Sequence, residues 1–412
     1  MAVVSLSIDS IAVGGDGVGR SAGLVVFVPR TAPGDVVTAQ IASKGQFARG
    51  KLADVVSPAA VRIEPPCPHY TRDQCGGCQL QHMTYDSQLI AKQLIIRDSI
   101  QRIGKRIVDA PLVERSPKDW RYRTKLTLAM RRRGARWIAG LHPYDDPARV
   151  FALADCPITD RRVVAAWREI MDADAFFPDA RELRGSVRIT SGGPTFVMIG
   201  GAKWSASKEF VAAVPSISAL WWQPAGEMPR RLLFDRRDDR SPSASFAQVN
   251  AEMAEVMRRY LLERVTSYEP RTVVDAYAGA GHTAIALSEQ GIRVTAIELD
   301  SDASAWSAAR IGVESRAIAA RVEDALPGVL PADVVLLNPP RAGVDKRVTE
   351  TLEAEAAHLR AIVYVSCNPA TLARDLARLP SYRIESLRGF DMFPQTAHVE
   401  TVCELRPDIA AA

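Results

Sequence analysis

The sequence lacks the features of a membrane-bound or exported protein. No apolar run reaches the roughly 20 residues that a membrane-spanning helix needs, so we expect no membrane partner. Residues 1–9 contain neither a basic cluster nor a long apolar run, which predicts no export signal, a cytoplasmic location and reduced thiols. The net charge is only +4, so any binding of a polyanion must come from a local patch.

Cysteine is scarce, with six residues in 412, yet four of them form a pattern. The stretch Cys67-x7-Cys75-x2-Cys78 and the later Cys156 make a set of four thiols. Four thiolates form a closed, soft site that suits zinc or an iron–sulfur cluster, and the spacing alone leaves both open. Disulfides are the alternative. Cys403 lies in an alternating strand pattern and is expected in the core.

The remaining cysteine, Cys367, lies where a strand should end and a helix begin. Residues 361–365 are an apolar, β-branched run of strand length, and Pro369 suits the first turn of a helix. A thiol at the carboxyl end of such a strand points into the crevice where open α/β sheets bind ligands. The pattern indicates a nucleophile, with a small buried hydrophobe as the alternative.

A glycine turn upstream predicts a nucleoside site. Residues 271–275 read as a strand that leads into Gly279 and Gly281, and the next strand, 294–298, ends in Glu298. Glycines let a ligand approach the backbone, and the carboxylate can accept both ribose hydroxyls. A dinucleotide also fits this pattern, but Asp275 would repel a pyrophosphate and suits a cationic sulfonium. We therefore expect S-adenosylmethionine.

A fourth strand, 333–337, runs into Asn338-Pro339-Pro340-Arg341. An Asn-Pro-Pro start can indicate an amino-group methyltransferase, in which an aromatic residue follows and stacks on the base. Here Arg341 follows, and a guanidinium suits a carbonyl oxygen or a phosphate better than an amine. A tight turn with a solvated arginine is the alternative.

Taken together, these motifs resemble those of a known family. The glycine turn, Glu298, the Asn338 loop, the Cys367 turn and residues 398–401 occur in the order and spacing of the RNA uridine-5-methyltransferases. The resemblance covers residues 245–405. The rest of the chain is similar to the iron–sulfur, TRAM-bearing branch that methylates large-subunit ribosomal RNA. The resemblance implies an enzyme that makes 5-methyluridine in 23S ribosomal RNA, with a transfer RNA as the alternative substrate.

The resemblance also assigns roles to residues. It implies that Cys367 adds to carbon 6 of uracil and that Glu400 removes the carbon 5 proton after methyl transfer. It places six residues around the cofactor, namely Gln248, Tyr277, His282, Glu298, Asp324 and Asn338. Family members more often have Asn at the position of His282 and Asp at that of Asn338. The resemblance further implies a [4Fe–4S] cluster on Cys67, Cys75, Cys78 and Cys156.

Two other classes of function compete with this interpretation. A non-catalytic RNA-binding or iron–sulfur scaffold protein would tolerate the loss of Cys367 and Glu400, and both are present in matching context. A nicotinamide-dependent oxidoreductase would bind NAD rather than S-adenosylmethionine. The Cys-x3-Cys-x2-Cys run of radical S-adenosylmethionine enzymes is absent from the sequence. We expect a monomer whose partner is RNA.

Residues 121–136 form a basic segment that holds six arginines and one lysine and no acid. Tyr122 lies within it, and Trp120 and Trp137 flank it. Because basic charge neutralises phosphates and aromatic faces stack on unpaired bases, the segment predicts an RNA contact, with a solvated hairpin as the alternative.

The patterns predict three domains. Residues 1–58 show short strands and glycine turns, which predict a five-stranded, OB-like barrel that resembles a TRAM domain. Residues 62–235 predict an α+β iron–sulfur domain with a helix near 84–103 and later hairpins. Residues 241–412 alternate strand and helix, which is typical of an α/β, seven-stranded, doubly wound class I methyltransferase domain.

Overall fold

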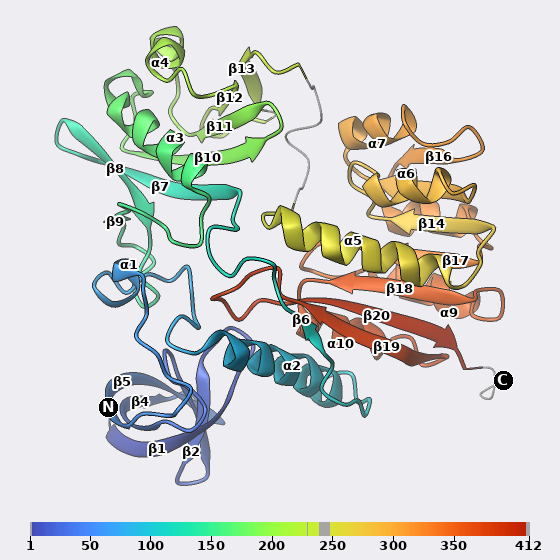
Figure 1. The fold of residues 1–412 in the computed structure, drawn as a ribbon, viewed down its shortest axis with the longest axis horizontal. Coiled ribbons are helices and arrows are strands. Elements are labelled where there is room, and N and C mark those ends of the chain that lie inside the picture. The colour runs from blue at the N-terminus through green and yellow to red at the C-terminus, as the bar shows by residue number, and fades with distance from the viewer. Residues whose placement is uncertain (1, 229, 239–247, 409–412) are drawn as a thin grey trace.

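The computed structural model describes residues 2–228, 230–238 and 248–408. Three sheets follow one another along this part of the chain: a closed barrel, a seven-stranded sheet and an eight-stranded sheet. Figure 1 shows the first two sheets on one side of the molecule and the eight-stranded sheet on the other. In the described ranges, no helix combines the length and the apolar character needed to cross a membrane.

The first sheet is a five-stranded barrel in the order β1-β2-β3-β5-β4, as the sequence predicts. Its alternating strands direct Leu6, Val26 and Val37 into a small apolar core. Gly14 and Gly15 have φ values of +104° and +95°, which lets the chain reverse between the first two strands. The strands are β1 (Ala2–Ile11), β2 (Gly17–Ser21), β3 (Leu24–Val28), β4 (Val36–Ser43) and β5 (Phe47–Ser57).

The seven-stranded sheet has the order β13-β12-β11-β10-β7-β8-β9. Leu126, Leu128 and Met130 alternate along β7 and point into a core that the helices of this region cover. The elements of this stretch of the chain are α1 (Pro68–Thr71), α2 (Tyr85–Arg102), β7 (Lys125–Arg133), β8 (Arg136–Leu141), β9 (Phe151–Ala152), α3 (Arg161–Asp172), a 3₁₀ turn (Asp174–Phe176), β10 (Glu182–Thr190), β11 (Gly193–Ile199), α4 (Ser207–Ala213), β12 (Ala219–Gln223) and β13 (Arg231–Asp235).

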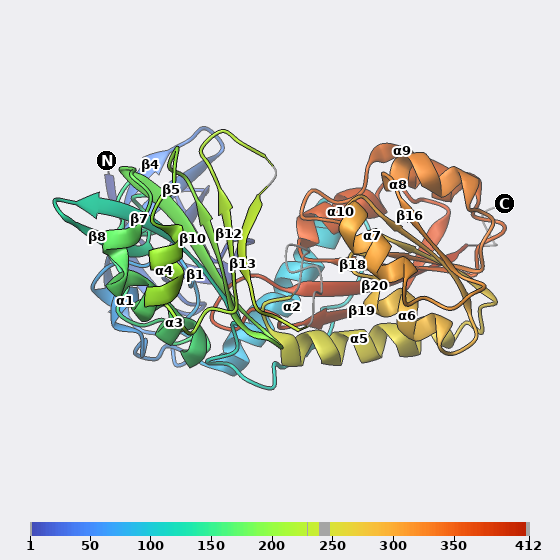
Figure 2. The same ribbon diagram turned by 90° about the horizontal axis from the view of Figure 1, so that it is seen from above.

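The eight-stranded sheet has the order β16-β15-β14-β17-β18-β20-β19-β6 and carries the predicted class I plan. Val273 and Val274, neighbours in β14, point into two different cores, so helices cover both faces (Figure 2). Strand β20 inserts antiparallel between β18 and β19. Its elements are α5 (Ala251–Thr266), β14 (Thr272–Ala276), α6 (His282–Ser288), β15 (Arg293–Glu298), α7 (Ser301–Ala308), β16 (Arg316–Ala319), α8 (Val322–Ala325), a 3₁₀ turn (Leu326–Gly328), β17 (Val334–Leu337), α9 (Lys346–Ala354), β18 (Ala361–Ser366), α10 (Pro369–Leu376), β19 (Tyr382–Phe390) and β20 (Glu400–Pro407).

Two elements of the central segment, a helix and a short strand, join the eight-stranded sheet and its core. Helix α2 packs beside α10, and its residues Leu89, Ile96 and Ile100 are buried in the same core as Val274. The short strand β6 (Val113–Glu114) pairs with β19 and makes an eighth strand where the sequence predicts seven. The domain boundaries stay a prediction, because the boundary at residue 241 lies outside the described residues.

Candidate active site

The thiol of Cys367 stands at the carboxyl edge of the catalytic sheet. Strand β18 is buried along its whole length and ends at Ser366, whose hydroxyl accepts a hydrogen bond from the N–H of Asn368 at 3.2 Å. The side chain of Asn368 caps α10 by accepting from the N–H of Ala370 at 3.1 Å. These contacts fix the turn that carries Cys367, which is only partly buried.

The register of two strands places Glu400 opposite Cys367. In the antiparallel pair of β18 and β20, Ser366 lies opposite Thr401, so Cys367 follows opposite Glu400. Glu400 is 3% exposed. Burial raises the pKa of Glu400 to about 7, against the positive charge of Arg341 and a hydrogen bond from Gln248.

The thiol and the carboxyl influence each other's ionisation. Burial raises the pKa of Cys367, the charge of Glu400 raises it further, and Arg341 lowers it through its charge and a hydrogen bond. A thiolate therefore forms more readily at Cys367 while Glu400 is protonated.

The loop that carries Arg341 is held against α10. Thr371 donates its hydroxyl to the carbonyl of Arg341 at 3.2 Å, and Arg374 donates to the carbonyl of Ala342 at 2.8 Å. Gly343 has a φ of +79°, and a Cβ there would lie 2.3 Å from a carboxylate oxygen of Asp375. The sequence indicated that Arg341 could meet a carbonyl or a phosphate, but only the structure shows that it faces both reactive groups.

Glu298 and the glycine turn form a cradle that fits a nucleoside. The carboxylate of Glu298 accepts the N–H groups of Gly279 and Asp300, each at 2.8 Å, and each of its oxygens keeps a second lone pair for a ribose hydroxyl. A Cβ on Gly279 would meet no atom within 4 Å, so the space above the turn is open to a ligand. His282, at the start of α6, and Asn338, after β17, are exposed at the same edge of the sheet.

Tyr277 directs attention to an acidic residue that sequence reasoning missed. Its φ of +63° is unusual for an aromatic residue, and burial raises its pKa, with the charge of Glu323 adding to the effect. Asp324, which we expected at the cofactor, is exposed and pairs with Arg347 at 2.9 Å. The charge of Glu323 thus acts on Tyr277, and Glu323 also lies 3.6 Å from a guanidinium nitrogen of Arg347, the arginine that pairs with Asp324. The two acids are adjacent on one helical turn, and the sequence pattern alone does not distinguish them.

Asp275 lies in β14, just before the glycine turn. It is 2% exposed, and burial raises its pKa to about 7 while the N–H of Ala284 in α6 donates to it. The carboxyl is thus buried against the first turn of α6, and the sequence argument that its charge would repel a pyrophosphate stays a prediction.

The four patterned cysteines gather between α1 and the loop after β9, although Cys156 is remote from the others in sequence. All four are free thiols. Burial raises the pKa of Cys78, and the nearby charges of Cys156, Cys75 and Cys67 raise it further. In the described part of the chain, no group of three or more Cys, His, Asp or Glu side chains has a geometry that could hold a metal ion. The four sulfurs nevertheless lie close enough for their charges to act on one another.

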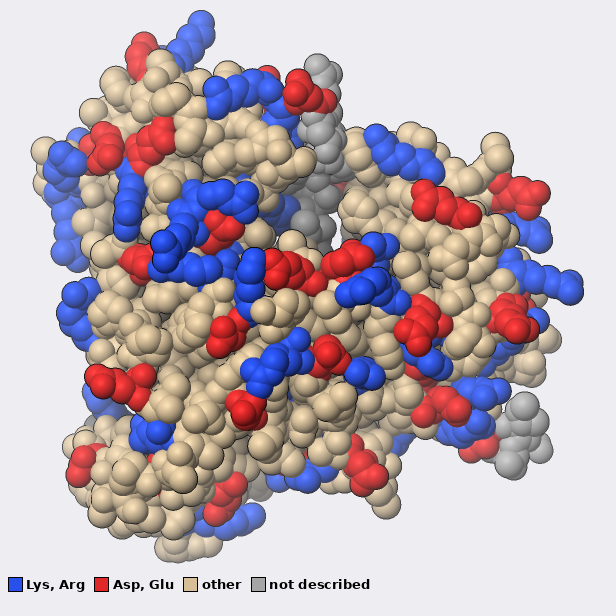
Figure 3. All heavy atoms as spheres, in the orientation of Figure 1, with Lys and Arg blue, Asp and Glu red and all other residues tan. Residues whose placement is uncertain are grey.

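Fewer side chains of the basic segment 121–136 are available to bind RNA than its composition indicates. Tyr122 and Trp137 are buried, so neither offers a face to a base. Acids from other parts of the chain pair with four of its arginines: Asp155 with Arg121 at 2.6 Å, Glu182 with Arg131 at 2.6 Å, Asp179 with Arg132 at 3.2 Å and Asp174 with Arg136 at 3.0 Å. On the face shown in Figure 3, basic and acidic side chains are interspersed.

A group of cations that includes Arg123 and Lys125 of this segment gathers on the open face of the seven-stranded sheet. Arg188 lies opposite Lys125 across β10 and β7, and Arg184 points to the same face. Burial lowers the pKa of Lys125 to about 8, and the charges of Arg188, Arg230, Arg123 and Arg184 lower it further. Figure 2 shows α3 and α4 on the other side of this sheet, away from the catalytic part. We call Arg123, Lys125, Arg184, Arg188 and Arg230 the basic sheet face.

The basic sheet face is connected to the active site through His398. Burial lowers the pKa of His398, and the charges of Arg341, Lys92 and Arg123 lower it further. His398 is thus acted on both by Arg123 of the basic sheet face and by Arg341 of the active site.

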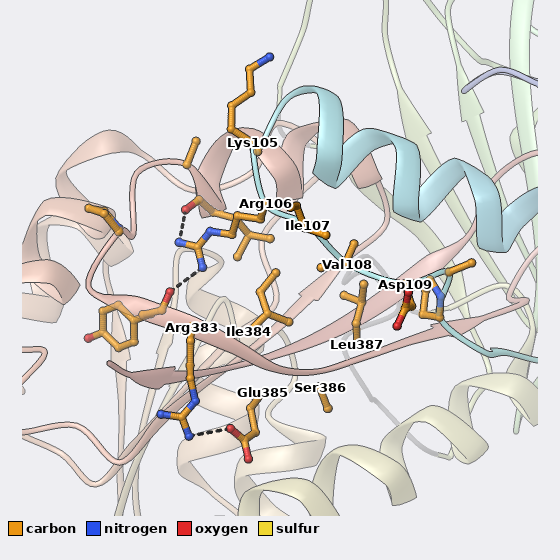
Figure 4. Close-up of a pocket in the computed structure, with 17 residues that line it drawn as sticks. Lys105, Arg106, Ile107, Val108, Asp109, Arg383, Ile384, Glu385, Ser386 and Leu387 are labelled. Carbon is orange, nitrogen blue, oxygen red and sulfur yellow. Dashed lines mark hydrogen bonds and ion pairs between the residues drawn. The ribbon is translucent and has the colours of Figure 1, made fainter. Parts of the chain in front are cut away.

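A separate hollow lies between residues 104–111 and β19 (Figure 4). Arg106 donates to the carbonyls of Tyr382 and Leu376 on its wall, at 2.5 and 2.8 Å. The hollow is lined by the first half of β19, whereas the active site adjoins its last residue, Phe390. It holds none of the predicted site residues.

Comparisons with known proteins agree with this geometry. Residues 313–406 match the family described as tRNA (Uracil-5-)-methyltransferase. Uncharacterized RNA methyltransferases of Thermosynechococcus vestitus and Gloeobacter violaceus are 31% and 33% identical to the chain, over 98% of it and over 98% and 96% of their own lengths. The structure of a Pyrococcus abyssi tRNA (uracil-54, C5)-methyltransferase, in complex with S-adenosyl-L-homocysteine, has a similar fold, with a TM-score of 0.70, 22% identity and coverage of 97% of this chain and 99% of that one.

Proposed function

Since the chain belongs to the RNA uracil-5-methyltransferase family, we propose that it methylates carbon 5 of one uridine in 23S ribosomal RNA through a covalent bond from Cys367. The observation that carries this proposal is the partly buried thiol of Cys367 opposite the buried carboxyl of Glu400. A nucleophile and a base that adjoin each other on neighbouring strands are what substitution at a weakly nucleophilic ring carbon requires.

In the first step, the thiolate of Cys367 forms a bond to carbon 6 of uracil. The electron pair of the carbon 5–carbon 6 double bond then moves towards carbon 5 and the oxygen on carbon 4. Arg341 is placed to stabilise the negative charge on that oxygen, because its guanidinium acts on both Cys367 and Glu400. S-adenosylmethionine, when bound, supplies a methyl group on a positively charged sulfur.

In the last step, Glu400 removes the proton from carbon 5. The electrons of that carbon–hydrogen bond restore the double bond, the bond between carbon 6 and sulfur breaks, and Cys367 leaves as a thiolate. A carboxylate with a pKa of about 7 suits this task, since it is a stronger base than an exposed one and is still ionised in part at neutral pH.

The remaining parts of the chain receive roles in binding. We infer that Glu298 holds the ribose of the cofactor, and that Gln248, Tyr277, His282 and Asn338 line its site, together with Glu323 or Asp324. The four patterned cysteines would hold a [4Fe–4S] cluster with a structural role. We further propose that the enzyme is a cytoplasmic monomer whose N-terminal barrel is a TRAM-type RNA-binding domain.

The basic sheet face is the best candidate for the RNA contact. The charges of Arg188, Arg230, Arg123 and Arg184 all act on Lys125, so the five cations lie near one another. Phosphates of a strand whose uridine enters the active site would neutralise this charge. The expected RNA surface therefore keeps Arg123 and Lys125 of the basic segment 121–136 and adds Arg184, Arg188 and Arg230.

Transfer RNA is a second candidate substrate, because the matching family is described by that substrate. Purified enzyme, methyl-labelled S-adenosylmethionine and unmodified transcripts of either RNA would distinguish the two. Label in transfer RNA alone would overturn the ribosomal assignment.

A substitution at Glu400 tests the mechanism. Glu400→Gln should allow attack by Cys367 and methyl transfer, and should stop before elimination. A covalent complex of protein and RNA that carries the labelled methyl group should then survive denaturing electrophoresis and disappear in the Cys367→Ala, Glu400→Gln double variant.

Glu404 provides the control, because it lies on the same face of β20 and is also buried, but pairs with Arg264 at 2.9 Å. If Glu404→Gln trapped the labelled complex and Glu400→Gln turned over normally, the assignment of the base would be wrong.

A further inference from the structure

We propose that Gln88, Lys92 and Tyr122, all outside the C-terminal half of the chain, are positioning residues that hold Glu400 in place for the final proton removal. They act through residues 391–399, the connection between β19 and β20, which we call the base loop. Phe390 and Glu400 lie opposite each other in the sheet, so the base loop closes directly on Glu400. This inference rests on the proposed role of Glu400 as the base.

Lys92 of α2 fixes the first part of the base loop. Its ammonium group lies 2.5 Å from a carboxylate oxygen of Asp391 and donates to the carbonyl of Phe393 at 3.1 Å. Both charged side chains are fully buried. A buried pair of this kind is costly to break, because the partner that remains is an uncompensated charge.

Gln88, one turn earlier on α2, fixes the middle of the base loop with both ends of its amide. Its oxygen accepts the backbone N–H of Gln395 at 3.0 Å, and its nitrogen donates to the side-chain oxygen of Gln395 at 2.9 Å. Gln395 has a φ of +70°, a conformation that is unfavourable for a residue with a Cβ. The reciprocal bonds from Gln88 therefore hold a backbone that would otherwise relax.

The cysteine region fixes the base loop from the opposite side. Tyr122 donates its hydroxyl to the carbonyl of Pro394 at 3.0 Å, and the N–H of Leu80 donates to the carbonyl of Gln395 at 3.0 Å. Leu80 follows Cys78 closely in sequence, and Tyr122 packs in the same cluster as Cys78. The base loop is thus clamped between α2 and the segment that follows the patterned cysteines.

We call the contacts of Gln88, Lys92 and Tyr122 with the base loop the clamp. Weakening the clamp should slow one step of the reaction more than the others. Proton removal needs the carboxylate of Glu400 at a defined distance from carbon 5, and a displacement of about 1 Å can cost on the order of 100-fold in rate. Attack by Cys367 and methyl transfer do not use Glu400. The methylated covalent complex should therefore accumulate when the clamp is weakened.

The test uses Gln88→Leu and Tyr122→Phe in the full-length enzyme, with Tyr382→Phe as the matched control. Tyr382 is also buried and donates its hydroxyl to a backbone carbonyl, that of Leu352, at 2.6 Å, but it does not touch the base loop. Tyr122→Phe and Tyr382→Phe should lose similar stability, about 1 kcal/mol for one hydrogen bond. We expect at least a tenfold fall in kcat and a labelled complex in the two clamp variants, with neither in the control.

Two results would overturn the inference: turnover in Gln88→Leu equal to that of the control, or a parallel fall in complex formation and turnover, which indicates general damage to the fold. Glu400→Gln serves as the reference. If it also fails to accumulate the complex, the proposed role of Glu400 is wrong, whatever the clamp variants do.

Discussion

Replacing Glu400 by Gln should stabilise the protein at alkaline pH while it stops turnover. The carboxyl has a pKa of about 7 in the folded protein and ordinarily one of 4.5. Below pH 4.5 it is protonated in both the folded and the unfolded state, so its contribution to stability is fully present there. As the pH rises towards 7, the unfolded chain ionises first, and the folded state loses that stability.

The expected size of the effect follows from the two pKa values. The rise from 4.5 to about 7 corresponds to about 3 kcal/mol in the free energy of unfolding, at about 1.4 kcal/mol per pH unit. Glutamine has a similar shape and does not titrate. The Glu400→Gln variant therefore keeps the stability that the wild type loses as the pH rises. Asp275 also has a raised pKa, but it is present in both proteins and cancels in the difference.

Urea unfolding of both proteins at several pH values measures the difference. Above pH 7 the variant should be more stable than the wild type by about 3 kcal/mol, and between pH 8 and pH 5 this advantage should shrink by about 2 kcal/mol. A difference that stays constant from pH 5 to pH 8 would refute the reasoning, because it would mean that Glu400 ionises alike in both states.

Three further predictions follow from other parts of the structure. Cys367→Ala should abolish methylation while calorimetry shows nearly unchanged affinity for S-adenosylmethionine, and measurable turnover would contradict the covalent mechanism. Protein purified without oxygen should be brown and contain iron and sulfide in near-equal amounts, whereas stoichiometric zinc without sulfide would favour the other metal. Arg184→Ala should weaken RNA binding and lower the slope of log affinity against log salt by about 1, and the control Arg132→Ala, whose partner is Asp179, should change the slope less.

The sequence predicts the individual elements of the site better than their arrangement. The strand before Cys367 is visible as an apolar run because it is buried on both faces, and the strand that ends at Glu298 is visible by its alternating apolar residues. That Cys367 faces Glu400 is not visible, since it depends on β20 inserting between β18 and β19 rather than adding outside them. Pairing between distant strands leaves little trace in local periodicity.

Charge was harder still to predict from the sequence. Residues 121–136 contain no acid, yet Asp155, Asp174 and Glu182 pair with arginines of this segment once the sheet forms. Conversely, Lys125 and Arg188 are separated along the chain and become neighbours through the register of β7 and β10. Local composition does not show which arginines are neutralised by distant acids, nor which cations become neighbours across strands.

The place of α2 and β6 in the catalytic sheet bears on how such a chain can be rebuilt by recombination. A gene exchange that joined another RNA-binding module directly in front of residue 248 would leave the core around Tyr364 and Leu372 without Ile96 and Ile100, and β19 without its edge partner. The N-terminal half of the chain and the catalytic sheet are therefore interleaved and do not form a string of exchangeable units. Any functional chimera has to carry residues 85–114 together with the catalytic half.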